Sequence, residues 1–132
     1  LALSIAARLD PSWDWRVCYQ SRVGPLAWIG PSTDEEIRRA GAEGKGVLIV
    51  PIGFVSEHIE TLVELDHDYA ALAREVGCAP YLRAPALGVA TAFIEGLATA
   101  ALAATTAGAV SAGSDWRCPA GFARCGLRGE AA

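Results

Sequence analysis

The stretch Val47-Leu-Ile-Val-Pro-Ile-Gly-Phe-Val-Ser-Glu-His-Ile-Glu60 decides the fold of this chain. Its first part, residues 47–52, is a continuous apolar run, which is typical of a strand buried on both faces of a parallel sheet. Ser56 then predicts the cap of a long helix over residues 57–76, which Gly77 closes. Because open α/β folds bind ligands at the carboxyl ends of parallel strands, this junction is predicted to belong to a ligand site.

Helical and extended segments alternate on both sides of this junction. The pattern predicts helices over 1–9, 33–44 and 89–107, and extended segments over 15–21 and 80–85. Ser32, Thr33 or Asp34 can cap the second of these helices, and Gly44 or Gly46 ends it. Alternation of this kind predicts an α/β fold, a three-layer Rossmann-like domain with a parallel sheet flanked by helices.

Length and charge limit the classes of protein to consider. The chain has 132 residues, which suits one domain, and it carries 11 basic and 15 acidic side chains for a net charge of -4. Binding to a nucleic acid backbone needs clustered Lys and Arg, so a nucleic acid partner is not expected. The chain contains no Met, so we expect either that its start was removed or that it is a piece of a longer polypeptide.

Neither end of the sequence predicts a membrane span. Residues 96–114 carry no charge, but Ala, Thr, Gly and Ser dominate them, and these residues add too little hydrophobicity for a transmembrane helix. We expect a packed helix there, so that one domain fills residues 1–107 and a flexible cysteine-containing tail fills residues 108–132. Because no secretory signal opens the chain, the predicted location is the cytoplasm.

The four cysteines fall into two kinds. Cys18 and Cys78 stand alone among apolar neighbours, where small buried thiols are common, whereas Cys118 and Cys125 flank a loop that contains Pro and Gly. In a chain without a secretory signal, such cysteines indicate reduced thiols or a metal centre more than a disulfide framework.

An acidic row follows the central junction. Residues 57–68 contain both histidines, His58 and His67, and no Lys or Arg, together with five carboxylates: Glu57, Glu60, Glu64, Asp66 and Asp68. Spacings of three and four place Glu57, Glu60, Glu64 and Asp68 on one face of a helix, where like charges repel. A divalent cation or bound protons would offset this repulsion, and a solvated acidic face is the alternative.

Two segments resemble the C-terminal half of the ferrochelatase family, enzymes that insert Fe²⁺ into protoporphyrin IX. One is Gln20-Ser-Arg-Val-Gly-Pro-Leu-Ala-Trp-Ile-Gly-Pro31, and the other is Val50-Pro-Ile-Gly-Phe-Val-Ser-Glu-His-Ile-Glu-Thr-Leu-Val-Glu-Leu-Asp66. The resemblance covers roughly residues 1–105. It implies a lyase of heme and porphyrin biosynthesis, with protoporphyrin IX and ferrous iron as substrates.

The resemblance also assigns roles to individual residues. His58, Glu60 and Glu64 would be catalytic, and the same three with Glu57 would meet the metal. Substrate binding would fall to Phe54, Trp28, Leu26, Ser21 and Arg22, with Trp28 and Leu26 packed on the macrocycle and Arg22 near a propionate. Whether the acidic row carries protons out or iron in stays open.

The resemblance also implies what this chain lacks. The family's Ser-Ala-His segment belongs to its N-terminal half and is not among these residues, so a missing N-terminal half-domain is an expected partner. Cys118 and Cys125 resemble part of a C-terminal [2Fe–2S] ligand set, which needs four thiolates, so Cys18, Cys78 or a residue of the missing half would contribute. A homodimer and peripheral contact with the inner membrane are compatible with the sequence. The alternatives are a non-catalytic porphyrin- or metal-binding fragment and a related cobalt or nickel chelatase.

Overall fold

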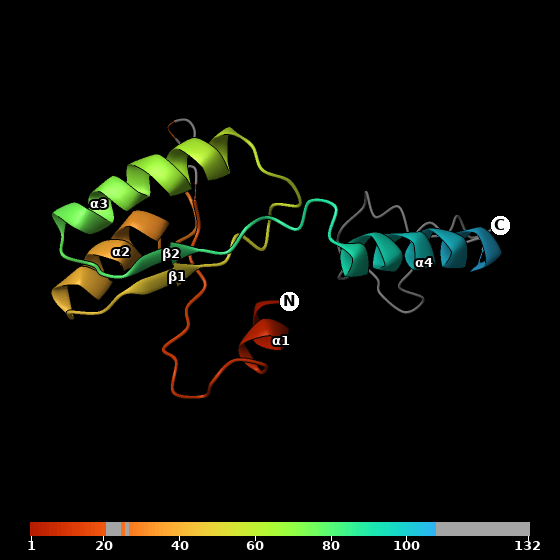
Figure 1. Cartoon of the computed structure of the whole chain (residues 1–132), viewed down its shortest axis with the longest axis horizontal. Coiled ribbons are helices and arrows are strands. Elements are labelled where there is room, and N and C mark those ends of the chain that lie inside the picture. The colour runs from red at the N-terminus through yellow and green to blue at the C-terminus, as the bar shows by residue number, and fades with distance from the viewer. Residues whose placement is uncertain (21–24, 26, 108–132) are drawn as a thin grey trace. The chain divides into compact units, whose positions relative to one another are not determined.

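The structure, a computed structural model, describes residues 1–20, 25 and 27–107, and the chain divides into two compact units, Leu1–Gly88 and Val89–Ala132. Figure 1 shows the elements of the first unit in order of colour. These are α1 (Ala2–Ala6), α2 (Thr33–Ala42), β1 (Val47–Ile49), η1 (Glu60–Tyr69), α3 (Ala70–Glu75) and β2 (Tyr81–Arg83). Helix η1 is a π-helix that continues directly into α3.

The two strands form a parallel sheet. Val47 lies opposite Tyr81, and the register ends with Ile49 opposite Arg83 (Figure 1). A backbone hydrogen bond of 2.8 Å from the Ala84 N–H to the Ile49 carbonyl continues the pairing just beyond the strands. The predicted α/β fold with a parallel sheet is confirmed, and both strands end at the same edge.

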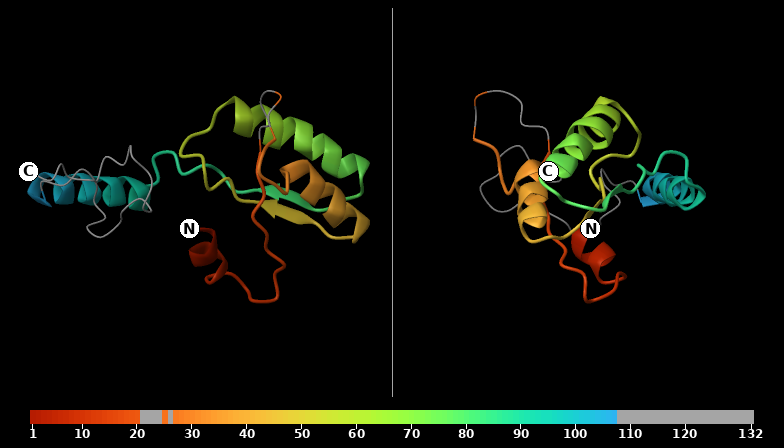
Figure 2. Two further views of the ribbon diagram at one scale, coloured as in Figure 1. Left: turned by 180° about the vertical axis from the view of Figure 1, so that it is seen from behind. Right: turned by 60° about the vertical axis from the view of Figure 1, so that its left-hand side comes forward.

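The core of this unit lies between the sheet and two helices. Its buried residues are Ile37 and Ala40 of α2, Ala73 of α3 and Cys78, and Val47 and Tyr81 from the strands pack against them. Figure 2 shows α2 and α3 side by side over the strands. The apolar stripe of each helix therefore covers the same face of the sheet.

The opposite face of the sheet is open in the part of the chain that the structure describes. Leu48 and Leu82, which lie opposite each other in the register, are 41% and 54% exposed. Successive side chains of a strand point to opposite faces, so these two leucines point away from α2 and α3. The expectation that residues 47–52 are buried on both faces is wrong for this unit, since these helices cover one face.

The helix ends agree with their sequence signals. Ser32 is the N-cap of α2, and its N–H donates to the Glu35 carboxylate at 2.8 Å, which is half of a capping box. Of the two predicted glycines, Gly44 lies closer to the end of this helix. Gly77, with a φ of 70°, follows α3 in the left-handed region that glycine adopts without a steric penalty.

Two expected elements are shorter than predicted. In the run 15–21, Tyr19 forms a single parallel bridge with Ser32, because Pro31 has no N–H with which to extend the pairing. The helix predicted from residue 57 begins instead at Glu60, so Ser56 does not cap it. Glu57 and His58 therefore lie in the loop before η1.

The described part of the second unit consists mainly of α4 (Thr91–Ala107), close to its predicted bounds. None of the helices in the described ranges combines the length and the apolar character that crossing a membrane requires. The predicted tail, with Cys118 and Cys125, lies outside the described residues.

Gly41 marks the close approach of α2 to the end of α3. A Cβ at this position would lie 2.4 Å from the Val76 carbonyl oxygen and 2.9 Å from its Cγ2. We expect Gly41→Ala to lower the free energy of unfolding by about 1–3 kcal/mol in urea denaturation, because overpacking forces neighbouring atoms to shift. A Cβ at Gly53 meets nothing within 4 Å, so Gly53→Ala is the matched control. Equal stability of the two variants would contradict this packing.

Candidate functional site

The loop that leaves β1 carries the centre of the candidate site. The rings of Phe54 and His58 meet edge to face, with centroids 4.7 Å apart and planes at 77°. Nδ1 of His58 accepts a hydrogen bond of 3.2 Å from the Glu60 N–H and lies 3.5 Å from the Glu60 carboxylate. An aromatic wall, an imidazole and a carboxylate thus lie together beyond the carboxyl end of a parallel strand.

Thr61 holds the backbone of His58 in place. Its side chain is fully buried, and its hydroxyl accepts a hydrogen bond of 2.9 Å from the His58 N–H. The same hydroxyl donates to the His58 carbonyl at 3.0 Å. The imidazole therefore projects from a backbone that is fixed through both of its polar groups.

Gln20 joins the segment before α2 to the first turns of η1. Its Nε2 donates to the backbone carbonyl of Glu60 and, at 3.0 Å, to the Glu64 carboxylate. The side-chain amide of Gln20 therefore links Glu60 and Glu64, the two residues of this helix that were predicted to be catalytic. Gln20 had no predicted role, although it begins the first of the two quoted segments.

Glu57 does not continue the row of Glu60 and Glu64. Its carboxylate receives Nη1 of Arg83 at 2.9 Å and 3.2 Å and the Ala86 N–H at 2.8 Å. The neighbouring Thr61 hydroxyl, the Ala86 N–H and the Arg83 guanidinium lower the pKa of Glu57 to about 2. Because this pKa lies below the ordinary value of 4.5, the charged form stabilises the fold above that value, and the contribution is lost as the pH falls toward 2.

The acidic row is therefore not a single ladder. Glu57 lies before the helix, and η1 is a π-helix, whose i→i+5 hydrogen bonds mean that residues spaced by four no longer stack directly above one another. Arg83 also binds Asp66, so one cation of β2 neutralises two of the five carboxylates. The prediction of one stacked acidic face is wrong, and part of its repulsion is offset by an arginine distant in sequence.

The remaining predicted residues are distributed as follows. Trp28 lies in the segment before α2 and is 49% exposed, and His67 pairs with Asp68 on the surface. Ser21, Arg22, Leu26, Cys118 and Cys125 lie outside the described residues. Among the described side chains, no three His, Cys, Asp or Glu residues come together closely enough to hold a metal ion.

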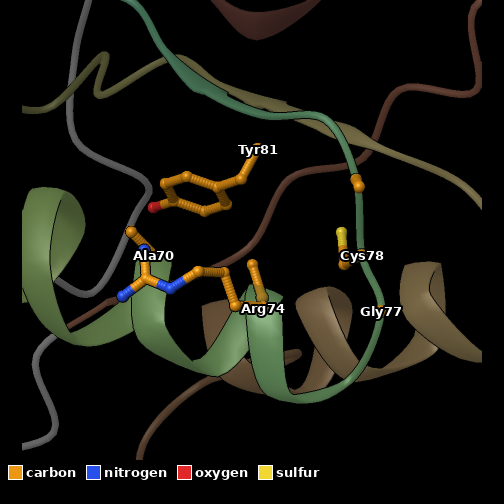
Figure 3. A pocket seen from close by; sticks show the side chains of 7 residues that line it. Ala70, Arg74, Gly77, Cys78 and Tyr81 are labelled. Atoms are coloured by element: carbon orange, nitrogen blue, oxygen red, sulfur yellow. The ribbon is translucent and has the colours of Figure 1, made fainter.

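A separate pocket of about 410 Å³ lies between α3 and β2 (Figure 3), and His58 is not among the residues that line it. Its lining consists of Ala70, Ala73, Arg74, Gly77, Cys78, Ala79 and Tyr81. Burial raises the pKa of the Cys78 thiol, and it also raises the pKa of Tyr81, to about 12. The Tyr81 hydroxyl donates to the Leu65 carbonyl at 2.8 Å, so Tyr81, which lines this pocket, also ties β2 to η1.

Sequence analysis missed Arg83, Thr61 and Gln20. Each acts through a partner whose identity depends on the fold, since Arg83 is 26 positions from Glu57 and Gln20 is 44 positions from Glu64. The only available signal for Arg83 was a cation in a short extended segment near an acidic row that had no cation of its own.

These features define a class of protein, an α/β domain whose candidate site lies at the carboxyl ends of parallel strands, where open α/β folds place their ligands. Comparison with known proteins gives the family. The sequence profile of the ferrochelatase family matches residues 2–105, so the chain belongs to the ferrochelatase family.

Individual relatives agree with this assignment. The chain is 62% identical over 129 residues to a ferrochelatase of Caulobacter vibrioides and 60% identical over 127 residues to one of Phenylobacterium zucineum. Each match covers 96% of this chain and 37% of the relative. A ferrochelatase of Hyphomonas neptunium is 49% identical over 95% of this chain and 36% of its own length. The chain thus spans little more than a third of the curated relatives it matches.

The Thr61 hydroxyl can be tested without changing the volume of the site. Thr61→Val leaves the His58 N–H without its partner, so we expect the free energy of unfolding to fall by about 1–3 kcal/mol. Thr61→Ser keeps the hydroxyl and is the matched control, which we expect to lose less. Urea denaturation of both variants is the measurement, and a loss in Thr61→Val no larger than that in Thr61→Ser would contradict a stabilising role of the hydroxyl's hydrogen bonds.

Proposed function

We propose that this chain supplies one side of the active site of a ferrochelatase, the lyase that inserts Fe²⁺ into protoporphyrin IX to form protoheme. The observation that carries the proposal is the His58–Glu60 pair beside Phe54, at the carboxyl end of β1, in a chain of the ferrochelatase family. A flat ligand needs apolar walls with a few polar groups aimed at its centre, and this arrangement supplies both kinds of group.

The proposed chemistry starts with the pyrrole protons. Metallation replaces two pyrrole N–H protons with one Fe²⁺, so the face of the macrocycle needs a proton acceptor. His58 can accept a pyrrole proton at Nε2 once its own proton is on Nδ1, which requires Nδ1 to exchange the Glu60 N–H that it accepts in this structure for a bond to the Glu60 carboxylate 3.5 Å away. The Glu60 carboxylate stabilises the imidazolium that forms, and loss of its Nε2 proton to water restores the neutral imidazole with Nε2 free for the second pyrrole proton.

Glu64 continues this path along η1. Gln20 bonds both the Glu60 carbonyl and the Glu64 carboxylate, so the two glutamates hold a fixed relation. We propose that His58, Glu60 and Glu64 are the groups that meet the protons and the iron. Glu57, which sequence analysis placed with the metal, would first have to release Arg83 and the Ala86 N–H.

The other groups complete the proposed substrate site. Phe54 and Trp28 would form apolar walls, with Leu26 beside them, and Ser21 and Arg22 would lie at the rim. The opposite wall would come from an N-terminal half, because the relatives are almost three times as long as the part they share with this chain. A cytoplasmic location, peripheral contact with the inner membrane and a homodimer stay predictions.

The catalytic roles can be tested in a protein that combines this chain with the N-terminal half of a ferrochelatase. We expect His58→Ala and Glu60→Gln each to lower the rate of Fe²⁺ or Zn²⁺ insertion by about 10²–10⁴-fold, as is typical when a general base is removed. His67→Ala is the matched control, because that imidazole is 81% exposed and pairs with neighbouring Asp68 on the surface, so its rate should not change.

Three results would overturn parts of this proposal. Unchanged rates of metal insertion in both variants would show that His58 and Glu60 do not have the proposed catalytic roles. Porphyrin binding without metal insertion, followed by visible absorbance, would identify a non-catalytic binding module. Absence of both binding and insertion would identify an inert fragment.

We also propose that a [2Fe–2S] cluster, where the protein carries one, takes Cys118 and Cys125 as two of its ligands. Such a cluster needs four thiolates. Cys78 does not suit this role, because its side chain is 2% exposed among Ile37, Ala40 and Ala73, and burial raises the pKa of its thiol. Cys18 is half-buried and receives the Thr33 hydroxyl at 3.5 Å, so the other ligands would come from Cys18 or from residues outside this chain.

Replacing single cysteines tests this ligand set. We expect Cys118→Ser and Cys125→Ser each to abolish the visible absorbance of the cluster in the protein purified without oxygen. Cys78→Ser should leave the absorbance per folded molecule unchanged, and it serves as the control. Loss of the absorbance in Cys78→Ser would contradict the assignment, and a colourless wild-type protein would remove the cluster altogether.

A further inference from the structure

Arg83, the last residue of β2, joins three segments that are distant in sequence. Its Nε and Nη2 bind the two carboxylate oxygens of Asp66 in η1, with the Nη2 bond at 2.6 Å. Its Nη1 reaches Glu57, in the loop before η1, at 2.9 Å and 3.2 Å. The same Nη1 lies 3.2 Å from the Ala84 carbonyl, so all three nitrogens of the guanidinium have an acceptor.

The guanidinium is more enclosed than those of Arg16 and Arg39, two other arginines of the unit that form several ion pairs. The Arg83 side chain is 13% exposed, compared with 31% for Arg39, whose ion pairs lie on the surface of α2. Exposed pairs contribute little, because water and salt screen them, whereas a two-pronged arginine–carboxylate pair is both stronger and geometrically specific. The contacts of Arg83 therefore fix the relative positions of the groups that they join.

The group fixed most directly is the residue next to His58. The Glu57 carboxylate also accepts the Ala86 N–H at 2.8 Å, so the end of β2 and the segment after it hold this carboxylate from two directions. On the other side of His58, Thr61 holds its backbone. The backbone that carries the imidazole is thus held between two anchors, one on η1 and one on β2.

Asp66 is the second carboxylate that Arg83 binds. It lies in the middle of η1, after Glu60 and Glu64, and its bidentate pair with Arg83 ties that helix to the sheet. The same guanidinium therefore binds both the loop with Glu57 and the helix that carries Glu60. A change in this side chain would alter the distance between His58 and the helix that carries its partners.

We infer that Arg83 is a positioning residue for the proposed metal insertion, acting through Glu57 and Asp66 to hold the His58 loop against η1. This inference rests on the proposed function. The hydrogen bonds of Arg83 go to Glu57, Asp66 and the Ala84 carbonyl, so its effect on the reaction is indirect. Glu57, by the same argument, belongs to this clamp and not to the groups that meet iron.

The test uses the protein that joins this chain to a ferrochelatase N-terminal half. We expect Arg83→Gln to lower kcat for Zn²⁺ insertion by about 10- to 100-fold, because small displacements of a reacting group have effects of this size. KM for the metal and for the porphyrin should change less than kcat, since Arg83 touches neither. Arg83→Lys keeps the charge but loses the two-pronged geometry, and it should recover part of kcat.

A double variant shows whether the effect passes through Glu57. If Arg83 positions the loop by this carboxylate, Arg83→Gln combined with Glu57→Gln should lower kcat little further than the more affected single variant. Arg39→Gln is the matched control, because it breaks an arginine network on α2 that does not contact the loop. Its kcat should equal that of the wild type. Thermal unfolding of every variant identifies any that fail to fold, and Arg83→Lys keeps the test decisive if Arg83→Gln is one of them.

The outcomes separate this inference from the proposed function. A wild-type protein that inserts no metal overturns the proposed function before any variant is compared. An active wild type with an equally active, folded Arg83→Gln or Arg83→Lys overturns the positioning role alone. Losses in kcat that multiply in the double variant would overturn the route through Glu57.

Discussion

The parallel pairing of β1 with β2 is the constraint on which the candidate site depends. Because the strands run in the same direction, Ile49 lies opposite Arg83, and both strands end at one edge of the sheet. The loop that leaves β1 and the guanidinium at the end of β2 therefore meet. Antiparallel pairing would place the ends of the two strands at opposite edges and would separate Arg83 from Glu57. α2 and α3 stabilise this pairing by covering one face of the sheet with Ile37, Ala40 and Ala73.

The charges around the site follow from this arrangement. Five carboxylates in a segment without a cation repel one another, and a metal ion or bound protons were expected to offset this repulsion. Arg83 offsets the charges of Glu57 and Asp66, whereas Glu60 lies beside His58 and Glu64 receives Gln20. Four of the five carboxylates thus divide into a pair that binds Arg83 and a pair that lies beside His58 and Gln20, and the fifth, Asp68, pairs with His67.

One face of the sheet and the candidate site are both exposed to solvent in the part of the chain that the structure describes. Leu48 and Leu82 are exposed on the face away from α2 and α3, and His58 and Glu60 are both partly exposed. This chain corresponds to 37% of the ferrochelatases of Caulobacter vibrioides and Phenylobacterium zucineum. Apolar surface of this kind is stabilised when further chain covers it, as the proposed N-terminal half would do.

The sequence by itself determined the features that depend on neighbouring residues. Ser32 and Glu35 start α2, Gly77 follows α3, and the apolar run from Val47 becomes a parallel strand. The quoted segments also led to the ferrochelatase family, because long motifs are specific without reference to a fold. Only the tertiary structure decided where η1 begins, which face of the sheet is covered, and which cation pairs with carboxylates of the acidic row. The physical reason is that these outcomes are set by contacts such as Arg83 with Glu57 and Gln20 with Glu64, whose partners approach each other only when the sheet and helices have packed.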